Sequence, residues 1–305
     1  MCTLPGICDG RVVVITGAAR GIGRAHALAF AAEGAKVVVN DLGAEVDGSG
    51  SSDGPAGEVV DAIRGMGGEA VANGDDVSDW EGAQRLVQTA LDTFGGLDTL
   101  VNNAGILRDR MLVNMSEDEW DAVIKVHLKG TFAPLRFAAA HWRERAKEGL
   151  ENDARIINTS SGSGLYGNPG QLNYGAAKAG IASMTNIAAK ELGRYGVTVN
   201  AIAPAALTRM TENLGFGPAT KDVAPGQFDE YAPENISPLV VWLGSAESKH
   251  VTGQVFNVAG GKVSVAEGWR RGPGRDKGDR WEPSELGPVV DELLADARPA
   301  ETLGA

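Results

Sequence analysis

Three polar side chains in this sequence have the types and spacing of a proton-transfer site. Ser161 precedes Tyr174 by thirteen residues, and Lys178 follows that tyrosine by four. A lysine one helical turn after a tyrosine lies on the same helix face, and its cation favours the phenolate of a phenol whose ordinary pKa is about 10. A serine hydroxyl can hold the oxygen of a reacting carbon as its charge changes. These residues predict acid/base chemistry on an alcohol or ketone.

The segments around these residues alternate between short β-branched runs and amphipathic stretches. Continuously apolar strands indicate burial on both faces, and strands that alternate with helices indicate parallel βαβ units. We therefore predict an α/β fold of the Rossmann type, a doubly wound, seven-stranded parallel sheet with helices on both faces. The predicted strands are Val12–Thr16, Lys36–Asn40, Glu69–Ala72, Thr99–Asn102, Arg155–Thr159, Val197–Ile202 and Gln254–Val258. The predicted helices are Gly23–Glu33, Gly57–Met66, Trp80–Phe94, Glu117–Glu148, Leu172–Arg194, Pro238–Ser245 and Glu285–Ala297.

A glycine-rich turn joins the first predicted strand to the first predicted helix. It spans Thr16–Gly23 with the spacing Gly-x-x-x-Gly-x-Gly. Glycines let the backbone approach a diphosphate closely, and the N-terminus of the helix favours the negative charge of that group. We expect the phosphates of a dinucleotide to be bound by Gly17, Arg20, Gly21, Ile22 and Gly23.

Asp41 follows the second predicted strand directly, where an acidic side chain reaches the hydroxyls of the adenosine ribose. A carboxylate accepts hydrogen bonds from free hydroxyls and repels the 2′-phosphate of NADP(H). Arg20 argues the other way, since an arginine in this turn could meet that phosphate. We predict NAD(H) as the cofactor, with NADP(H) as the less favoured alternative.

Two further segments follow the third and fourth predicted strands. Asp76-Val77 could contact the adenine, and Asn103-Ala104-Gly105 could pass the ribose and the nicotinamide. Either segment could instead be turn chemistry. Because open α/β sheets bind ligands at the carboxyl ends of their strands, we assign both segments to the cofactor site.

Composition and charge exclude other function classes. The chain has 305 residues, 43% of them hydrophobic and 22% charged, which is typical of a soluble globular protein. A formal charge of −12 argues against a nucleic-acid or anionic-membrane partner. Two cysteines, Cys2 and Cys8, have no companions that complete a metal site. No secretion signal pattern or long apolar run is present, so we expect a cytoplasmic protein.

Three stretches depart from the alternating pattern. Gly43–Gly57 is rich in Gly and Ser and predicts a surface loop, and Ala205–Asn235 predicts a lid over the substrate. We expect residues 1–262 to form a single catalytic domain. Residues 263–305 form a polar extension, in which Trp269 and Trp281 predict docking on the domain or on a neighbouring subunit.

Across roughly residues 10–261 the chain resembles the short-chain dehydrogenase/reductase family. The resemblance implies a nicotinamide cofactor and hydride transfer to or from a hydroxyl carbon. It also implies that Tyr174 and Lys178 contact the cofactor, and that the helices at 117–148 and 172–194 form the interface of a homodimer or homotetramer. The matching motifs are Thr16–Gly23, Asp76-Val77, Asn102–Gly105, Ser161, Tyr174 with Lys178, and Pro204 with Thr208, the last of which holds the nicotinamide side in the family.

Two positions depart from the pattern of the family. The fourth catalytic residue is usually asparagine, and His127 occupies its place here. In the family that residue acts largely through its backbone carbonyl, which holds a water beside the lysine, so the resemblance implies a catalytic place for His127. The side chain of His127 could instead have a purely structural role. The usual Pro-Gly after the sixth strand is Pro204-Ala205, so the following loop leaves the sheet differently.

A narrower likeness is to the (3R)-hydroxyacyl-CoA dehydrogenases that form part of peroxisomal multifunctional enzyme type 2, also described as 17β-hydroxysteroid dehydrogenases. It rests on Val39–Gly43, Asn103–Arg110, Val126–Leu128 and Tyr166–Asn168. It implies NAD-dependent oxidation of a (3R)-3-hydroxyacyl-CoA to a 3-oxoacyl-CoA by a stand-alone bacterial enzyme of fatty-acid or steroid metabolism.

Three alternative functions stay open. A hydroxysteroid dehydrogenase would use the same catalytic residues on a different alcohol. An NADPH-dependent 3-oxoacyl-carrier-protein reductase would run the reaction toward the alcohol, and Asp41 argues against it. A non-catalytic dinucleotide-binding protein would be expected to lack Tyr174 or Lys178, and this chain has both.

Overall fold

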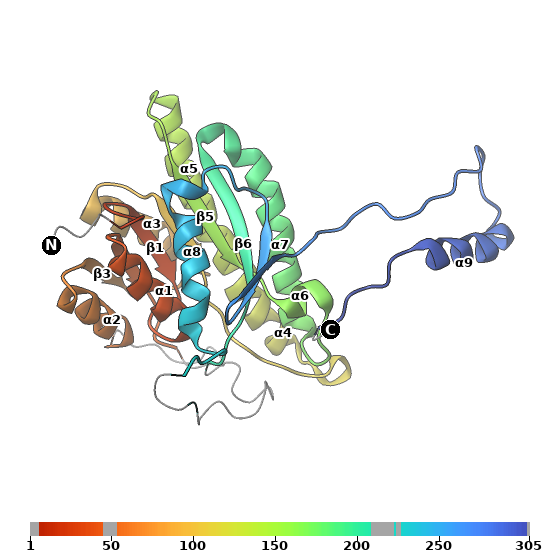
Figure 1. Ribbon diagram of the computed structural model, residues 1–305, viewed down its shortest axis with the longest axis horizontal. Coiled ribbons are helices and arrows are strands. Elements are labelled where there is room, and N and C mark those ends of the chain that lie inside the picture. Colours follow the sequence, from red (N-terminus) through yellow and green to blue (C-terminus); the bar gives the residue numbers. More distant parts are fainter. Residues whose placement is uncertain (1–5, 45–53, 209–222, 224–226, 304–305) are drawn as a thin grey trace.

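A sheet of eight strands forms the centre of the computed structural model, which describes residues 6–44, 54–208, 223 and 227–303 (Figure 1). The strand order is β3-β2-β1-β4-β5-β6-β7-β8, and the first seven strands are parallel, as we predicted. The strands are β1 Val12–Thr16, β2 Lys36–Asn40, β3 Glu69–Asn73, β4 Thr99–Asn102, β5 Ala154–Thr159, β6 Val197–Ala205, β7 Val255–Ala259 and β8 Lys262–Val265.

The eighth strand corrects our prediction of a seven-stranded sheet. β8 pairs antiparallel with β7 through the two-residue turn Gly260-Gly261, in which Gly260 has a positive φ of 52°. Such a turn is a hairpin signal, but all four residues of β8 are exposed and carry no core pattern. The extension therefore leaves the sheet only after Val265, a few residues beyond the boundary that we predicted.

Helices cover both faces of the sheet because neighbouring strand residues point to opposite sides. Val13, Ile15 and Val37 pack with α1, α2 and α8, whereas Val12 and Val14 pack with α3, α5 and α7 (Figure 1). The helices are α1 Gly21–Ala32, α2 Gly54–Gly65, α3 Trp80–Phe94, α4 Glu117–Ile124, α5 Gly130–Lys147, α6 Gly162–Tyr166, α7 Leu172–Leu192, α8 Ser237–Gly244 and α9 Leu286–Asp296. Short 3-10 turns are η1 Leu112–Asn114, η3 Gly193–Tyr195, η5 Pro233–Ile236, η6 Ala246–Ser248 and η7 Pro283–Glu285.

The long helix predicted over residues 117–148 is interrupted. A capping box between Ser116 and Glu119 starts α4, and a π-helical turn, η2 (Lys125–Lys129), separates α4 from α5. Such turns are uncommon and frequently mark functional sites, because they re-aim the residues that they contain. Here the turn contains His127.

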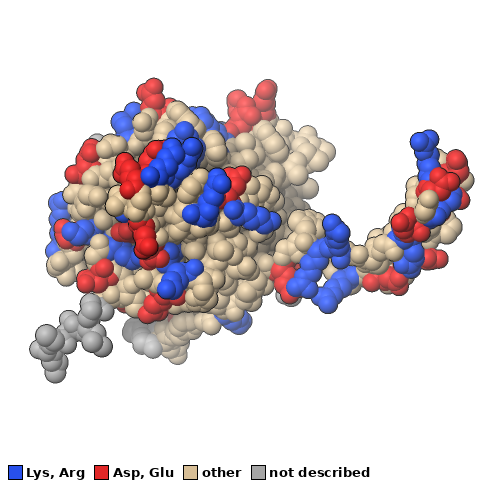
Figure 2. Space-filling view, turned by 90° about the horizontal axis from the view of Figure 1, so that it is seen from above, with Lys and Arg blue, Asp and Glu red and all other residues tan. Residues whose placement is uncertain are grey.

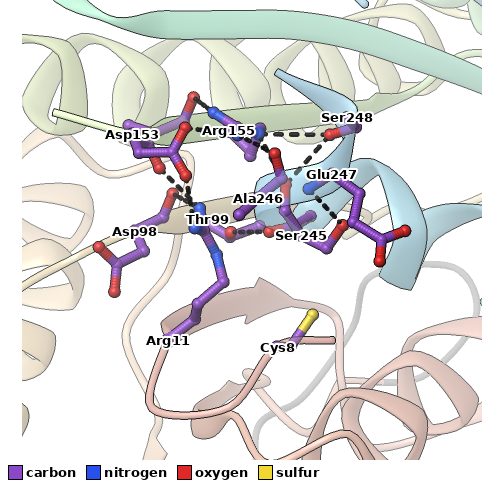
Figure 3. A network of polar contacts seen from close by, with 12 residues as sticks. Cys8, Arg11, Asp98, Thr99, Asp153, Arg155, Ser245, Ala246, Glu247 and Ser248 are labelled. Carbon is purple, nitrogen blue, oxygen red and sulfur yellow. Dashed lines mark hydrogen bonds and ion pairs between the residues drawn. The ribbon is translucent and has the colours of Figure 1, made fainter. Parts of the chain in front are cut away.

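A buried arginine network holds the edge of the sheet opposite the strand C-termini (Figure 3). Arg155 of β5 is 1% exposed, and its Nε donates to the carbonyl oxygen of Ser245 at 2.9 Å. Its Nη2 donates to Asp153 Oδ1 at 2.5 Å, while Arg11 donates to the other carboxylate oxygen at 2.9 Å. These bonds join β5 to the turn after α8 and satisfy a charge that burial would otherwise penalise.

The C-terminal extension leaves the domain after β8 and carries α9 away from it (Figure 1). Trp269 is fully exposed, no residue of α9 is buried, and Arg275 pairs with Glu292 and Asp296 within the extension. The end of the chain returns to the domain, because a Cβ on Gly162 would lie 2.6 Å from Leu303 Cδ1. Docking of both tryptophans therefore stays a prediction.

Several sequence-based expectations concern residues outside the described ranges. The predicted lid at 205–235 and the loop at 43–57 are described only in part, and Cys2 lies outside as well. Cys8 is buried, with its thiol 3.6 Å from the carbonyl oxygen of Val241. Within the described ranges, no helix has the length and apolar character needed to span a membrane. On the face shown in Figure 2, Lys and Arg alternate with Asp and Glu without forming a continuous basic area.

Candidate active site

One cavity of about 430 Å³ lies at the carboxyl ends of the parallel strands, and the predicted site residues surround it. Of these residues, His127 alone is not part of the cavity wall. It packs behind Gly105, where a Cβ would lie 2.3 Å from the Cε1 atom of the histidine. The wall contains Gly17, Arg20, Gly21, Ile22, Gly23, Asp41, Asp76, Val77, Asn103, Ala104, Gly105, Ser161, Tyr174, Lys178, Pro204 and Thr208.

The glycine turn at the cavity floor requires its glycines for steric reasons. Gly17 has a φ of +62°, and a Cβ there would lie 2.7 Å from the Cα of Ala104. A Cβ on Gly23 would lie 2.0 Å from the carbonyl oxygen of Gly17. The turn therefore packs tightly against the end of β4, and α1 starts with its N-terminus at the cavity, as an anion site needs.

Asn103 shapes this turn. Its side-chain amide donates to the carbonyl oxygens of Thr16 and Gly17, both at 3.1 Å. The Thr16 hydroxyl oxygen accepts the backbone N–H groups of Asn103 at 2.9 Å and Ala104 at 3.0 Å. The segment after β4 therefore also stabilises the glycine turn, which was the alternative role that we considered for it. These hydrogen bonds hold the cavity floor in place.

The carboxylate of Asp41 lies at the far end of the cavity from Tyr174. It accepts hydrogen bonds from the backbone N–H of Ala19 at 3.0 Å and of Gly43 at 2.8 Å. Each oxygen keeps a further lone pair for a ligand hydroxyl. Arg20 also lines the cavity, and its Nη1 donates to the carbonyl oxygen of Ala44 at 3.2 Å.

The remaining predicted cofactor residues lie along the same cavity wall. Asp76 accepts the N–H and the hydroxyl of Ser78, which holds the turn after β3. Pro204 is the second-last residue of β6, and Thr208 lies three residues after the end of this strand. A Cβ on Gly21 would lie 3.3 Å from Thr208 Cγ2, so the segment after β6 passes directly over the glycine turn.

The three residues of the predicted proton-transfer site meet between β5, α6 and α7. Ser161 caps α6, its hydroxyl oxygen accepting the N–H of Ser163 at 3.2 Å, and its side chain is hydrogen-bonded to that of Tyr174. The Nζ of Lys178 lies 5.5 Å from the centroid of the Tyr174 ring and donates to the carbonyl oxygen of Thr159 at 2.6 Å. One substrate oxygen can therefore reach both the serine and the tyrosine hydroxyls.

Burial dominates the electrostatics of these groups. Desolvation raises the pKa of Tyr174 to about 12, although the hydrogen bond from Ser161 lowers it, and desolvation lowers the pKa of Lys178 to about 7. We predicted that the lysine would favour the phenolate. In the protein alone desolvation has the largest effect on both pKa values, because removal from water penalises the charged form of each group.

The imidazole of His127 contacts Ile106 in the loop after β4 and the ring of Tyr174. Its Nε2 lies 2.7 Å from the carbonyl oxygen and 3.1 Å from the nitrogen of Ile106, and its ring meets the Tyr174 ring edge-on at a centroid distance of 5.1 Å. Burial lowers its pKa to about 3, so the imidazole is neutral near pH 7. Its backbone carbonyl accepts the N–H of Gly130. These contacts support a structural role of the imidazole, and the catalytic place of His127 stays a prediction.

Residues that sequence reasoning did not select also line the substrate side of the cavity. Ser163, Asn168 and Gln171 form a polar wall beside Ser161, and Gln171 is hydrogen-bonded to Asp109. Ser163 is two residues after Ser161 and Gln171 is three before Tyr174, and this proximity in the sequence is the signal that could have identified them.

A doubly wound sheet with a glycine turn, a strand-end acid and a Ser-Tyr-Lys cluster on one cavity defines a dinucleotide-dependent oxidoreductase. The model of the short chain dehydrogenase family matches residues 11–216. The chain belongs to the short-chain dehydrogenase/reductase family and is an oxidoreductase that binds NAD or NADP.

Known proteins similar to this chain agree with that assignment. Hydroxyacyl-CoA dehydrogenase ChsB1 of Mycobacterium tuberculosis is 46% identical over 97% of this chain and 92% of its own length. Peroxisomal multifunctional enzyme type 2 of Mus musculus is 46% identical over 86% of this chain, which spans 33% of that longer protein. The crystal structure of a short chain dehydrogenase from Mycobacterium avium superposes with a TM-score of 0.88 at 62% identity, covering 98% of this chain and 100% of that one.

Proposed function

We propose that this protein oxidises (3R)-3-hydroxyacyl-CoA to 3-oxoacyl-CoA with NAD⁺. The observation that carries the proposal is the placement of Ser161, Tyr174 and Lys178 on the same cavity as Asp41 and the glycine turn. The thioester substrate is supported by the resemblance to a protein whose name specifies hydroxyacyl-CoA.

The residues supply the proton chemistry of the reaction. Tyr174 takes the proton of the substrate hydroxyl, Ser161 holds the substrate oxygen, and Lys178 stabilises the charge on the tyrosine. A bound nicotinamide accepts the hydride from the same carbon, so that alcohol and NAD⁺ become ketone, NADH and a proton. General-base catalysis contributes about 10²–10⁴-fold, and positioning supplies much of the rest.

The position of Asp41 supports NAD rather than NADP. Asp41 holds a carboxylate at the end of the cavity where the ribose hydroxyls are expected, and that charge repels a 2′-phosphate. Arg20 is the opposing observation, since it lines the cavity and only its Nη1 is engaged, with the carbonyl oxygen of Ala44.

A substrate and cofactor panel tests this function. Purified protein is assayed with NAD⁺ and NADP⁺ against 3-hydroxyacyl-CoAs of both configurations and against hydroxysteroids. We expect turnover of the (3R) thioesters with NAD⁺, and a loss of at least about 10²-fold in Tyr174→Phe. Exclusive (3S) turnover, turnover of steroids alone or near-normal activity of Tyr174→Phe would each contradict the proposal.

We also infer that the extension, residues 263–305, docks on a neighbouring subunit of a homodimer or homotetramer. The support is the apolar face of α9, where Leu286, Val290 and Leu294 are exposed, together with the bare ring of Trp269. Leu294→Lys is expected to lower the assembly state or the melting temperature measured by light scattering and calorimetry. A monomeric wild-type protein would contradict the inference.

A further inference from the structure

A chain of hydrogen bonds runs along the substrate side of the cavity from the loop after β4 to the catalytic serine. The Nε2 of Gln171 donates to Asp109 Oδ2 at 2.7 Å, and the Ser163 hydroxyl donates to Gln171 Oε1 at 2.7 Å. The N–H of Ser163 then donates to Ser161 Oγ at 3.2 Å. Gln171 and Ser163 are buried, so the middle of the chain is shielded from bulk water, whereas Asp109 is partly exposed. It joins the three segments that approach the reacting carbon.

The chemistry of these groups fixes the direction of every bond. An ionised carboxylate only accepts, so Asp109 turns the amide nitrogen of Gln171 toward itself and the amide oxygen toward Ser163. Asn168 donates to the same amide oxygen at 2.9 Å, which agrees with this orientation. Ser163 has one hydroxyl hydrogen and gives it to Gln171. Ser161 accepts a backbone hydrogen, and its own hydroxyl hydrogen is shared with Tyr174 here and would turn to the substrate oxygen when a substrate binds.

Asp109 also places a negative charge near Tyr174, because the side chain of the preceding residue, Asn173, donates to the carbonyl oxygen of Arg108 at 3.0 Å and so holds the two segments together. Its Oδ1 is buried and finds no hydrogen-bond partner among the described residues, and burial raises the pKa of its carboxyl although the bond from Gln171 lowers it. The pKa of Tyr174 is raised first by burial and further by the charge of Asp109. Other charged or titratable groups around this tyrosine are Lys178 on α7, His127 and Lys125 in η2, Arg108 beside Asp109, and the ion pair Arg110–Glu119 at 2.9 Å.

We propose that Asp109 is a positioning residue of the active site, whose carboxylate orients Gln171 and Ser163 beside Ser161 and whose charge controls how readily Tyr174 exchanges its proton. This role rests on the proposed function, in which Tyr174 is the proton acceptor. The carboxylate affects the position of Ser161 through the hydrogen bonds of Gln171 and Ser163, and it affects the charge of Tyr174 electrostatically. These two effects can be separated by substitution.

The test compares pH profiles of kcat for four variants, each measured with the best secondary alcohol of the panel. Asp109→Asn keeps an amide oxygen that accepts from Gln171 but removes the charge. Gln171→Met removes all three side-chain hydrogen bonds of Gln171, to Asp109, Ser163 and Asn168, at similar volume and leaves the charge. Asp109→Ala removes both features, and Asp92→Asn removes one exposed carboxylate from α3 as the control for net charge.

We expect Asp109→Asn to move the rising limb of the oxidation profile to lower pH by roughly 0.5–1 unit, the effect of one partly screened charge, with the plateau within about twofold of wild type. Gln171→Met should lower the plateau by about 10–100-fold without moving the limb, because the serine loses its orientation. Asp109→Ala should show both changes and Asp92→Asn neither. An unmoved limb in Asp109→Asn, or a full plateau in Gln171→Met, would overturn the proposal.

The failure of the proposed function is seen separately. If wild type turns over another alcohol but no 3-hydroxyacyl-CoA, the substrate assignment fails and the four profiles still decide the role of Asp109. If Tyr174→Phe keeps the wild-type limb, the tyrosine is not the titrating base and the proposal about Asp109 fails with it.

Discussion

The charge of Asp41 is expected to set the choice between NAD and NADP, and Asp41→Asn removes that charge at nearly constant volume. At about 5 Å and an effective dielectric constant of about 20, a carboxylate and each unit of phosphate charge repel by about 3 kcal/mol. The mouth of the cavity is open to water and salt, which reduces the net effect to about 1.5–3 kcal/mol, or roughly 10–150-fold.

Asp41→Asn should also weaken binding of NAD⁺ itself. One charge-assisted hydrogen bond to a ribose hydroxyl contributes about 1.5 kcal/mol, which is about tenfold. The asparagine has one acceptor oxygen, so it keeps only one of the two backbone bonds, to Ala19 or to Gly43, that the carboxylate makes. Together these effects predict that the ratio of kcat/KM for NAD⁺ to that for NADP⁺ falls by about 10²–10³-fold.

The assay measures initial rates with both cofactors at one saturating alcohol concentration. Asp61→Asn, which removes an exposed carboxylate from α2, is the matched control and should leave the ratio unchanged. A thermal melt of each variant separates loss of fold from loss of selectivity. The reasoning is refuted if Asp41→Asn changes the ratio by less than about fivefold, or if the wild type itself prefers NADP⁺.

Three further predictions concern stability and packing. Burial lowers the pKa of His26 from 6.5 to about 3, so the unfolded state binds more protons than the folded state between these pH values. The free energy of unfolding from urea melts should therefore fall by about 1.4 kcal/mol per pH unit below pH 6.5 for each such histidine. The fall should be smaller in His26→Asn. Gly164→Ala should lower kcat at least tenfold (~1.4 kcal/mol), because the new Cβ would lie 2.7 Å from the Cβ of Lys178. Gly65→Ala is the control and should leave kcat unchanged, because no atom lies within 4 Å of its Cβ position. Arg155→Met should lower the free energy of unfolding measured in urea melts by about 2–4 kcal/mol without changing kcat. An unfolding free energy that stays constant below pH 6.5, a fully active Gly164→Ala and an unchanged melt of Arg155→Met would contradict these three expectations.

The sequence predicts most of the fold because periodic burial is a local property. The strands Val12–Thr16, Lys36–Asn40 and Thr99–Asn102 have the bounds that their β-branched runs predict. β8 was missed because an exposed edge strand has no buried face, and only its Gly260-Gly261 turn marks it.

The candidate site shows the same division between local pattern and tertiary contact. The glycine turn and the Ser161, Tyr174 and Lys178 cluster follow from spacing, because each motif lies at a strand end or on one helix face. Asp109 is different, since its partner Gln171 is 62 residues away and no periodicity links the two. The pKa of Tyr174 is a related case, because the sequence shows the neighbouring lysine but not the burial that raises the pKa.

The opposite pKa shifts of the catalytic pair predict different pH dependences for the two directions of the reaction. Ketone reduction needs a protonated Tyr174, and with a pKa of about 12 the hydroxyl stays protonated across the neutral range. Alcohol oxidation needs that proton to leave, and it also needs Lys178 charged to hold the phenolate, although burial lowers the pKa of the ammonium to about 7. With NAD⁺ bound, the positive charge of the nicotinamide would favour the phenolate. The oxidation rate should therefore rise with pH up to about pH 7, where Lys178 is still charged, and level off or fall above it as the ammonium loses its proton. The reduction rate should stay flat over the same range, as initial rates in both directions on one alcohol–ketone pair will show. Parallel profiles would mean that Tyr174 does not carry the proton in either direction.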